Sequence, residues 1–143
     1  MNLDLTEDQA QIRDAVRELC VQEFAPHAAR WDQDGTVPRD AVETLAAQGF
    51  LGMAVPEAWG GLGYDSRTIT TVIEEISRVS ASLAIMIAVH NSVGLLPVYR
   101  FATDEQKRKY LPRLPAARSV FAKIRYTPAC WPFVTQFFVP LST

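Results

Sequence analysis

The sequence is poor in cysteine and histidine, and this scarcity argues against the commonest metal sites. Only Cys20 and Cys130, and only His27 and His90, occur among 143 residues. A structural zinc site requires several converging ligands with characteristic short spacings, which these four residues do not show. Cys20 falls on an apolar helical stripe, where a free thiol acts as a small hydrophobic side chain. We therefore expect no metal site and a reducing, cytoplasmic location.

The chain also lacks a strong net charge and an apolar N-terminal segment. Its formal net charge is −2, which does not favour nucleic acid as a partner. The N-terminal residues MNLDLTEDQ are acidic and polar and do not resemble a signal peptide. Charge is uneven along the chain, since 14 of 16 acidic residues lie in residues 1–78 and seven of 14 basic residues follow residue 102. We interpret the basic end as a solvated helix face and a tail, with an anion-binding patch as the alternative.

The longest stretch without Lys, Arg, Asp or Glu runs from Val79 to Tyr99 and includes SLAIMIAVHNSVGLLPVY. A membrane span needs about 20 mostly apolar residues, but serine, histidine, asparagine, glycine and proline interrupt this one. We predict instead a buried core helix near Ser82–Gly94, which Gly94 and Pro97 stop and restart. Its polar centre, His90 and Asn91, is either a hydrogen-bonded structural pair or a contact to a ligand.

Start and stop signals predict helices on both sides of this stretch. Thr6 with Gln9, and Thr103 with Gln106, are capping-box patterns. The first helix is expected to end or kink at Pro26. Two further helices are expected over PRDAVETLAAQG and from Asp65 or Ser66 to about Val79.

Two motifs in this region suggest chemistry but have simpler explanations. The glycines of FLGMAVPEAWGGLGYD follow no predicted strand and precede no lysine, so tight turns are favoured over a phosphate-binding loop. Glu74 and Glu75 could form an acid–base pair. Both precede Arg78 by one helical turn, so we predict that they pair with it on a solvated helix face.

Four segments, which together cover about residues 3–114, follow one another in the order LTEDQAQIRDAVRELCVQEFAP, GFLGMAVPEAWGGLGYD, IEEISRVSASLAIMIAVHNSVG and ATDEQKRKYLPRL. This order of segments resembles the N-terminal helical domain of the acyl-CoA dehydrogenases. The resemblance implies an all-α domain over residues 1–114 of an oxidoreductase of fatty acid metabolism. In that family FAD accepts a hydride from the β-carbon of an acyl-CoA while a glutamate removes the α-proton.

The resemblance also implies which residues meet the substrate. The helix matching Ser82–Gly94 would line the acyl-chain cavity, and helical spacing places five candidates on one face, namely Ile85, Met86, Val89, His90 and Val93. Packing against neighbouring helices would explain the same spacing. No residue of this sequence matches the family's catalytic glutamate or its contacts to FAD.

The resemblance ends near Leu114. Residues 115–143 form an atypical tail, expected to be irregular, partly disordered or not native, with a short strand near Phe133–Val139 as one alternative. Without the family's other domains an apolar face stays exposed, which predicts self-association or a partner chain. We therefore hypothesise a truncated member of the family that is inactive alone. The alternatives are a non-enzymatic helical interaction module and a small lipid- or acyl-binding bundle.

Overall fold

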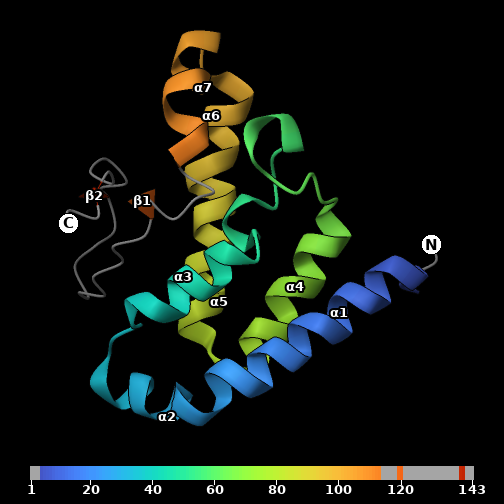
Figure 1. Ribbon diagram of the computed structural model, residues 1–143, viewed down its shortest axis with the longest axis vertical. Helices are drawn as coiled ribbons and strands as arrows, with labels where there is room; N and C mark the ends of the chain where they lie inside the picture. The colour runs from blue at the N-terminus through green and yellow to red at the C-terminus, as the bar shows by residue number, and fades with distance from the viewer. Residues whose placement is uncertain (1–3, 114–118, 121–138, 141–143) are drawn as a thin grey trace.

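The computed structural model describes residues 4–113, 119–120 and 139–140 (Figure 1). The α-helices are α1 (Glu7–Leu19), α2 (Ala25–Asp34), α3 (Arg39–Ala47), α4 (Ser66–Val79), α5 (Ala81–Val89), α6 (Leu96–Phe101) and α7 (Asp104–Tyr110). Two π-helical turns, Cys20–Phe24 and His90–Leu95, and three 3-10 turns, Phe50–Gly52, Glu57–Trp59 and Leu111–Arg113, complete the helical part. The prediction of an all-α fold is confirmed.

Only four residues of the tail are described, and they form a minimal antiparallel pair. In it β1 (Ser119–Val120) lies opposite β2 (Val139–Pro140). Of the strand predicted near Phe133–Val139, Val139 is in β2, and residues 133–138 lie outside the described residues. The remaining predictions for the tail also fall outside them.

The core forms where α4 packs against both α1 and α5. In Figure 1 α1 and α4 lie together at the lower right, and the helical run from α5 to α6 forms the long axis. The largest cluster of buried side chains draws on these helices, on α3 and on the loop after α3. Its main members are Val16, Cys20, Phe24, Leu45, Leu51, Met53, Val72, Ile76, Leu83 and Ile87. A smaller cluster of Val55, Leu95 and Leu111 joins the same loop to the π turn before α6 and to the 3-10 turn after α7.

The N-terminal caps of α1 and α4 are joined to each other. Thr6 and Gln9 form the predicted capping box, with two hydrogen bonds of 3.2 Å. Asp65 caps α4 by accepting from the backbone N–H of Thr68 at 2.7 Å. The side chain of Gln9 then donates to the Asp65 carboxylate at 3.4 Å and to the Thr68 hydroxyl at 3.3 Å. Capping residues usually bond only within their own helix. Here Gln9 also joins the N-terminal end of α1 to the N-terminal end of α4.

Both π-helical turns precede a proline, and the chain remains helical through each of them. The first helix bends at the turn before Pro26 (Figure 1), which agrees with the kink that was one of the two predicted alternatives, and it continues as α2, which was not predicted. Pro26 is in the first turn of α2, where its missing N–H breaks no bond. The predicted stop at Gly94 is wrong. The chain stays helical through the π turn, where the Leu96 N–H bonds to the carbonyl five residues earlier, and Pro97 occupies the first turn of α6.

The resulting run Ala81–Phe101 is, within the described part of the chain, the one helix whose length and composition would allow a membrane span. A core helix passes the same test, and one side of this helix is in the core. Leu83, Ile87 and Leu95 are completely buried, and His90 and Asn91 lie beside them. The prediction of a buried central helix near Ser82–Gly94 is confirmed for this side.

We expect Ile87→Asp to unfold the domain, because Ile87 has no exposed surface and an unpaired buried charge costs about 3–5 kcal/mol. Ile85→Asp is the matched control on the same helix. Ile85 is 50% exposed, so this change should alter the unfolding free energy by about 1 kcal/mol or less. Far-ultraviolet circular dichroism with urea titration measures both. Equal stability of the two variants would contradict the placement of the helix.

Candidate functional site

The five predicted cavity-lining residues lie on one helix but at three different depths. Ile85 and Val93 are 50% and 45% exposed, which is unusual for large apolar side chains in this molecule. Met86 and Val89 are half-buried, and Met86 packs on the main core cluster. His90 is completely buried. The structure thus groups Ile85, Val89 and Val93 toward the open side of the helix and turns His90 into the core.

The open side of this helix carries no charge from Ala81 to Tyr99, and the exposed Arg100 follows near its end. The exposed or half-buried residues there are small, apolar or hydroxyl-bearing, namely Ala81, Ser82, Ile85, Ala88, Val89, Ser92, Val93 and Leu96. The Ser92 hydroxyl donates to the Ala88 carbonyl at 2.7 Å, so it presents little polarity outward. An uncharged face of this kind suits an apolar ligand chain or an apolar protein surface.

Asn91 fixes the opposite, buried side of the same helical segment. Its Nδ2 donates to the carbonyls of Phe50 at 2.9 Å and Ile87 at 3.0 Å, and its Oδ1 accepts from the Ala54 N–H at 3.2 Å. Asn91 is 2% exposed, and the two bonds that its Nδ2 donates are buried, while the bond from Ala54 is part-buried. Of the two alternatives for Asn91, the structural role is therefore the one that the contacts support.

The loop that Asn91 holds is folded tightly on itself. The backbone N–H groups of Leu62, Gly63 and Tyr64 donate to the carbonyls of Gly52, Val55 and Met53, at 3.1, 2.8 and 2.9 Å. A Cβ on Gly61 would overlap the carbonyl oxygens of Val55 and Gly52, so only glycine fits at this crossing. The glycines thus serve the tight turns that were predicted.

The same loop does not fit a phosphate-bearing cofactor such as the FAD that the resemblance implies. A pyrophosphate needs several free backbone N–H groups converging on it. Here the N–H groups of all five residues from Gly60 to Tyr64 donate to backbone carbonyls of residues 52–57. These five N–H groups are therefore not available to a phosphate, which supports the tight-turn interpretation of the glycines.

The adjacent carboxylates Glu74 and Glu75 have different environments, and one differs from the prediction. Glu74 is exposed and pairs with Arg78 at 2.8 Å, as predicted. Glu75 also keeps the predicted pair with Arg78, at 3.6 Å, but it is 3% exposed and receives two hydrogen bonds from Arg17 of α1, at 2.9 and 3.0 Å. The prediction of a solvated face is therefore wrong for Glu75, whose side of α4 is covered by α1.

The Arg17 contact also sets the ionisation of Glu75. Hydrogen bonds from Arg17 lower the pKa of Glu75 below the ordinary glutamate range, although burial opposes them, and the charges of Arg17 and Arg78 add to the effect. A carboxylate held ionised by an arginine is a weak base and is not available to remove a proton from a substrate. Glu75 is therefore a structural anion that joins α1 to α4.

Nucleophilic and metal chemistry find no support in the described residues. Burial raises the pKa of Cys20 to about 11, so its thiol stays protonated at neutral pH. Within residues 4–113, 119–120 and 139–140, no group of three or more His, Cys, Asp or Glu could hold a metal ion. Among the features of the described residues, the open side of this helix is therefore the one best suited to bind an apolar ligand or an apolar protein surface.

A family model and a curated relative both match this chain, and both point to the same protein family. A family model described as acyl-CoA dehydrogenase, N-terminal domain, matches residues 6–118. An acyl-CoA dehydrogenase of Bacillus subtilis (strain 168) is 36% identical over 112 residues, which cover 78% of this chain and 30% of that protein. The sequence therefore matches along most of its own length, but this chain spans only about 30% of the relative.

Solved structures of related proteins share the fold of this chain, and they too match it over only about 30% of their own length. An acyl-CoA dehydrogenase from Geobacillus kaustophilus matches with a TM-score of 0.75 at 31% identity and covers 81% of this chain and 30% of its own. A glutaryl-CoA dehydrogenase from Mycobacterium smegmatis in complex with FADH2 shares the fold, with a TM-score of 0.76 at 24% identity and the same coverage.

We expect Asn91→Leu to destabilise the chain by about 2–4 kcal/mol, because each buried backbone group left unsatisfied costs about 1–3 kcal/mol. Ser92→Ala is the matched control. Its hydroxyl bonds only within the helix and is exposed, so its loss should cost about 0.5 kcal/mol or less. Urea unfolding followed by circular dichroism measures both values. A loss for Asn91→Leu no larger than the control's would show that the amide does not hold the loop.

We expect acid to weaken the attachment of α1 through Glu75. Because its folded pKa is lowered, Glu75 contributes stability above the ordinary glutamate pKa of about 4.3, and this contribution is lost as pH falls through the lowered value. Glu75→Gln should therefore reduce the acid sensitivity of the unfolding free energy, whereas Glu74→Gln, on the exposed side, should leave it nearly unchanged. Urea titrations between pH 7 and acid compare the three chains. Parallel pH profiles for all three would contradict this role.

Proposed function

The chain belongs to the acyl-CoA dehydrogenase family, and on that premise we propose that it supplies one wall of the cavity that holds the acyl chain of an acyl-CoA thioester. The reaction class is FAD-dependent α,β-desaturation. The wall is the open side of the helical run from α5 to α6, with Ile85, Val89 and Val93 facing the acyl chain. Met86 and His90 lie behind them and shape the wall from within.

One observation carries this proposal: the helix is firmly held on one side and uncharged on the other. The buried side is fixed by Leu83, Ile87 and the hydrogen bonds of Asn91, while Ile85 and Val93 stay about half exposed. Ligand sites are largely preformed and are lined mostly by apolar side chains. A rigid helix with an uncharged, half-exposed apolar face meets both conditions for an acyl chain.

The described residues supply neither of the other two parts that the reaction needs. Hydride transfer requires a flavin ring fixed against the acyl β-carbon and a base placed at the α-carbon. The N–H groups of Gly60 to Tyr64 all donate to backbone carbonyls, and Glu75 is held by Arg17. We therefore propose that FAD and the catalytic base come from polypeptide beyond these 143 residues, and that the chain alone neither holds FAD tightly nor oxidises acyl-CoA.

A non-enzymatic interaction module is the second candidate, and the same exposed face favours it. An apolar helix face can bind a partner protein as well as an acyl chain. The two candidates differ in what the partner brings. Only the first requires that the partner carry a flavin and that the complex act on acyl-CoA.

The test is complementation with a polypeptide that carries the other domains of a relative. The chain alone, with FAD, an acyl-CoA and an electron-accepting dye, should show no turnover, and adding the second polypeptide should restore it. Val93→Asp should then raise the KM for acyl-CoA about tenfold or more, equivalent to about 1.4 kcal/mol, because it places a charge against the acyl chain. The control Glu57→Lys changes an exposed loop residue and should leave KM unchanged.

Two outcomes would contradict the proposal. Turnover by the chain alone that is lost on mutating one of its own residues would show that it holds its own catalytic machinery. Restored turnover with the same KM for Val93→Asp and for the control would show that this helix face does not line the cavity.

A further inference from the structure

The outer side of α1 is an acidic surface with an exposed apolar residue at its end. Glu7, Asp14 and Glu18 are 7 and 4 residues apart, so they share one side of the helix. All three are exposed, and of the six ion pairs among the described residues only Arg13–Asp14 involves any of them. Val21 follows one turn later and is 57% exposed. We refer to Glu7, Asp14, Glu18 and Val21 as the acidic face.

The α6–α7 hairpin carries the opposite character. Arg100, Lys107, Arg108 and Lys109 take part in none of those six ion pairs. The ammonium groups of Lys107 and Lys109 lie over the rings of Tyr99 and Tyr110, at 5.7 and 5.4 Å from the centroids. Phe101, at the end of α6, is 83% exposed, the highest value among the exposed large apolar residues. These four cations with Phe101 are the basic end, which the carboxylates of Asp104 and Glu105 oppose only in part.

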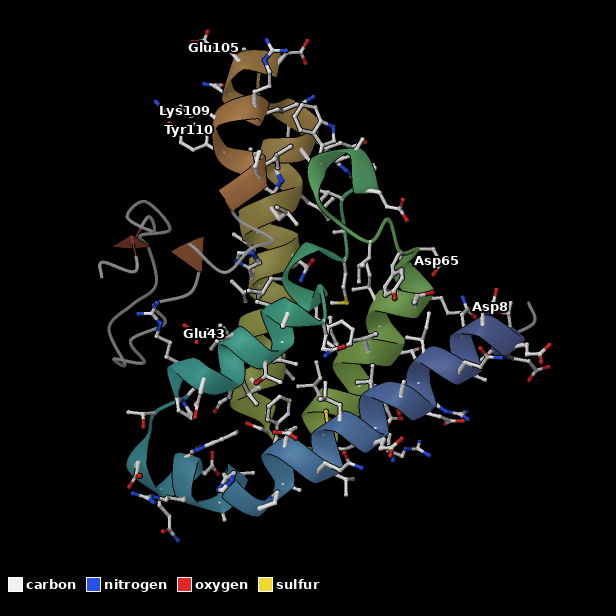
Figure 2. All side chains as sticks on the ribbon, viewed as in Figure 1. Asp8, Glu43, Asp65, Glu105, Lys109 and Tyr110 are labelled. Atoms are coloured by element: carbon white, nitrogen blue, oxygen red, sulfur yellow. The ribbon has the colours of Figure 1, made fainter. Side chains whose placement is uncertain are left out.

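The two surfaces cannot neutralise each other within one copy. In Figure 1 α7 lies at the top of the molecule and α1 along the lower right, with the loop after α3 and α4 between them. Figure 2 shows the same separation between Asp8 on α1 and Lys109 on α7. Each surface therefore presents its charge and one exposed apolar side chain to solvent, at a different end of the molecule.

We propose that the basic end of one copy binds the acidic face of α1 of a second copy. The charges are complementary, and each surface offers an apolar anchor, Phe101 on one and Val21 on the other. Because the two surfaces differ, the contact is head-to-tail, and successive copies add to a chain rather than close as a symmetric pair. The contact is held largely by exposed charges, so it is weak and depends strongly on salt.

Sedimentation of the full chain with designed charge reversals tests this contact. At an ionic strength of about 0.02 M, where the Debye length is roughly 20 Å, the average mass should rise with concentration to about twice that of one copy or more. At about 0.5 M salt, where the Debye length is roughly 4 Å, it should return to that of one copy. Asp14→Lys with Glu18→Lys should abolish the rise, and so should Arg108→Glu with Lys109→Glu.

Mixing the two double variants gives the decisive result. In the mixture, the unmodified basic end of the α1 variant meets the unmodified acidic face of the α7 variant, and the two reversed surfaces also have opposite charges. Association should therefore reappear in the mixture and not in either variant alone. Glu43→Lys with Glu57→Lys, an equal charge reversal outside both surfaces, should behave as the unmodified chain. Circular dichroism confirms that each variant is folded.

Three results would overturn the proposal. The first is a single copy at every salt concentration. The second is association that salt and both reversals leave unchanged, which would point instead to the uncharged face of α5. The third is association lost only in the α7 variant, which would mean that the basic end binds an acidic surface other than α1.

Discussion

The three hydrogen bonds of the Asn91 side chain are the constraint on which the arrangement of the helices around α5 depends. Two of them join the π-helical turn His90–Leu95 to the carbonyl of Phe50 and the N–H of Ala54, in a loop that has little regular structure of its own, and the third goes to the carbonyl of Ile87 in α5. That loop then supplies Val55 to the small cluster with Leu95 and Leu111. Because the groups are buried, water cannot replace these bonds, and the loop has one position against the helix.

The same architecture separates a fixed side of the helix from an open one. Asn91 and the buried side chains of α5 hold it from behind, and Glu75 with Arg17 holds α1 against α4, which in turn packs on α5. On the other side of the helix, Ile85 and Val93 remain about half exposed, because the described residues do not cover them as they cover the buried side. A helix that is anchored so thoroughly on one side, and uncharged on the other, is suited to present a defined surface to an acyl chain or to the rest of a larger enzyme.

Much of this fold could be predicted from local sequence signals, and the errors have a common physical cause. Capping boxes at Thr6 and Thr103, the cap at Asp65 and the apolar stripes are short-range features, and they identified helix starts and the core helix. Pro26 was predicted to end or kink the first helix, and Gly94 with Pro97 to stop and restart the central one. A sequence does not show that a π turn before each proline lets the helix continue. Glu75 was misplaced because its partner, Arg17, is 58 residues away. Asn91 was identified as polar and central, but its loop partners are also distant in sequence. Helical spacing also does not show that His90 is buried while Ile85 is half exposed, because this difference depends on how α5 packs against its neighbours.

The central claim, that an acyl chain lies along the open side of the run from α5 to α6, is tested most directly by photo-crosslinking. An acyl-CoA with a diazirine at the end of its chain would be bound to the complex of this chain with the flavin-carrying domains of a relative and then irradiated. Mass spectrometry of the digested product locates the label. We expect label on Ile85, Val89 or Val93, since carbene insertion occurs at the residue that the chain end touches. Label confined to other parts of the complex, with none on residues 81–101, would contradict it.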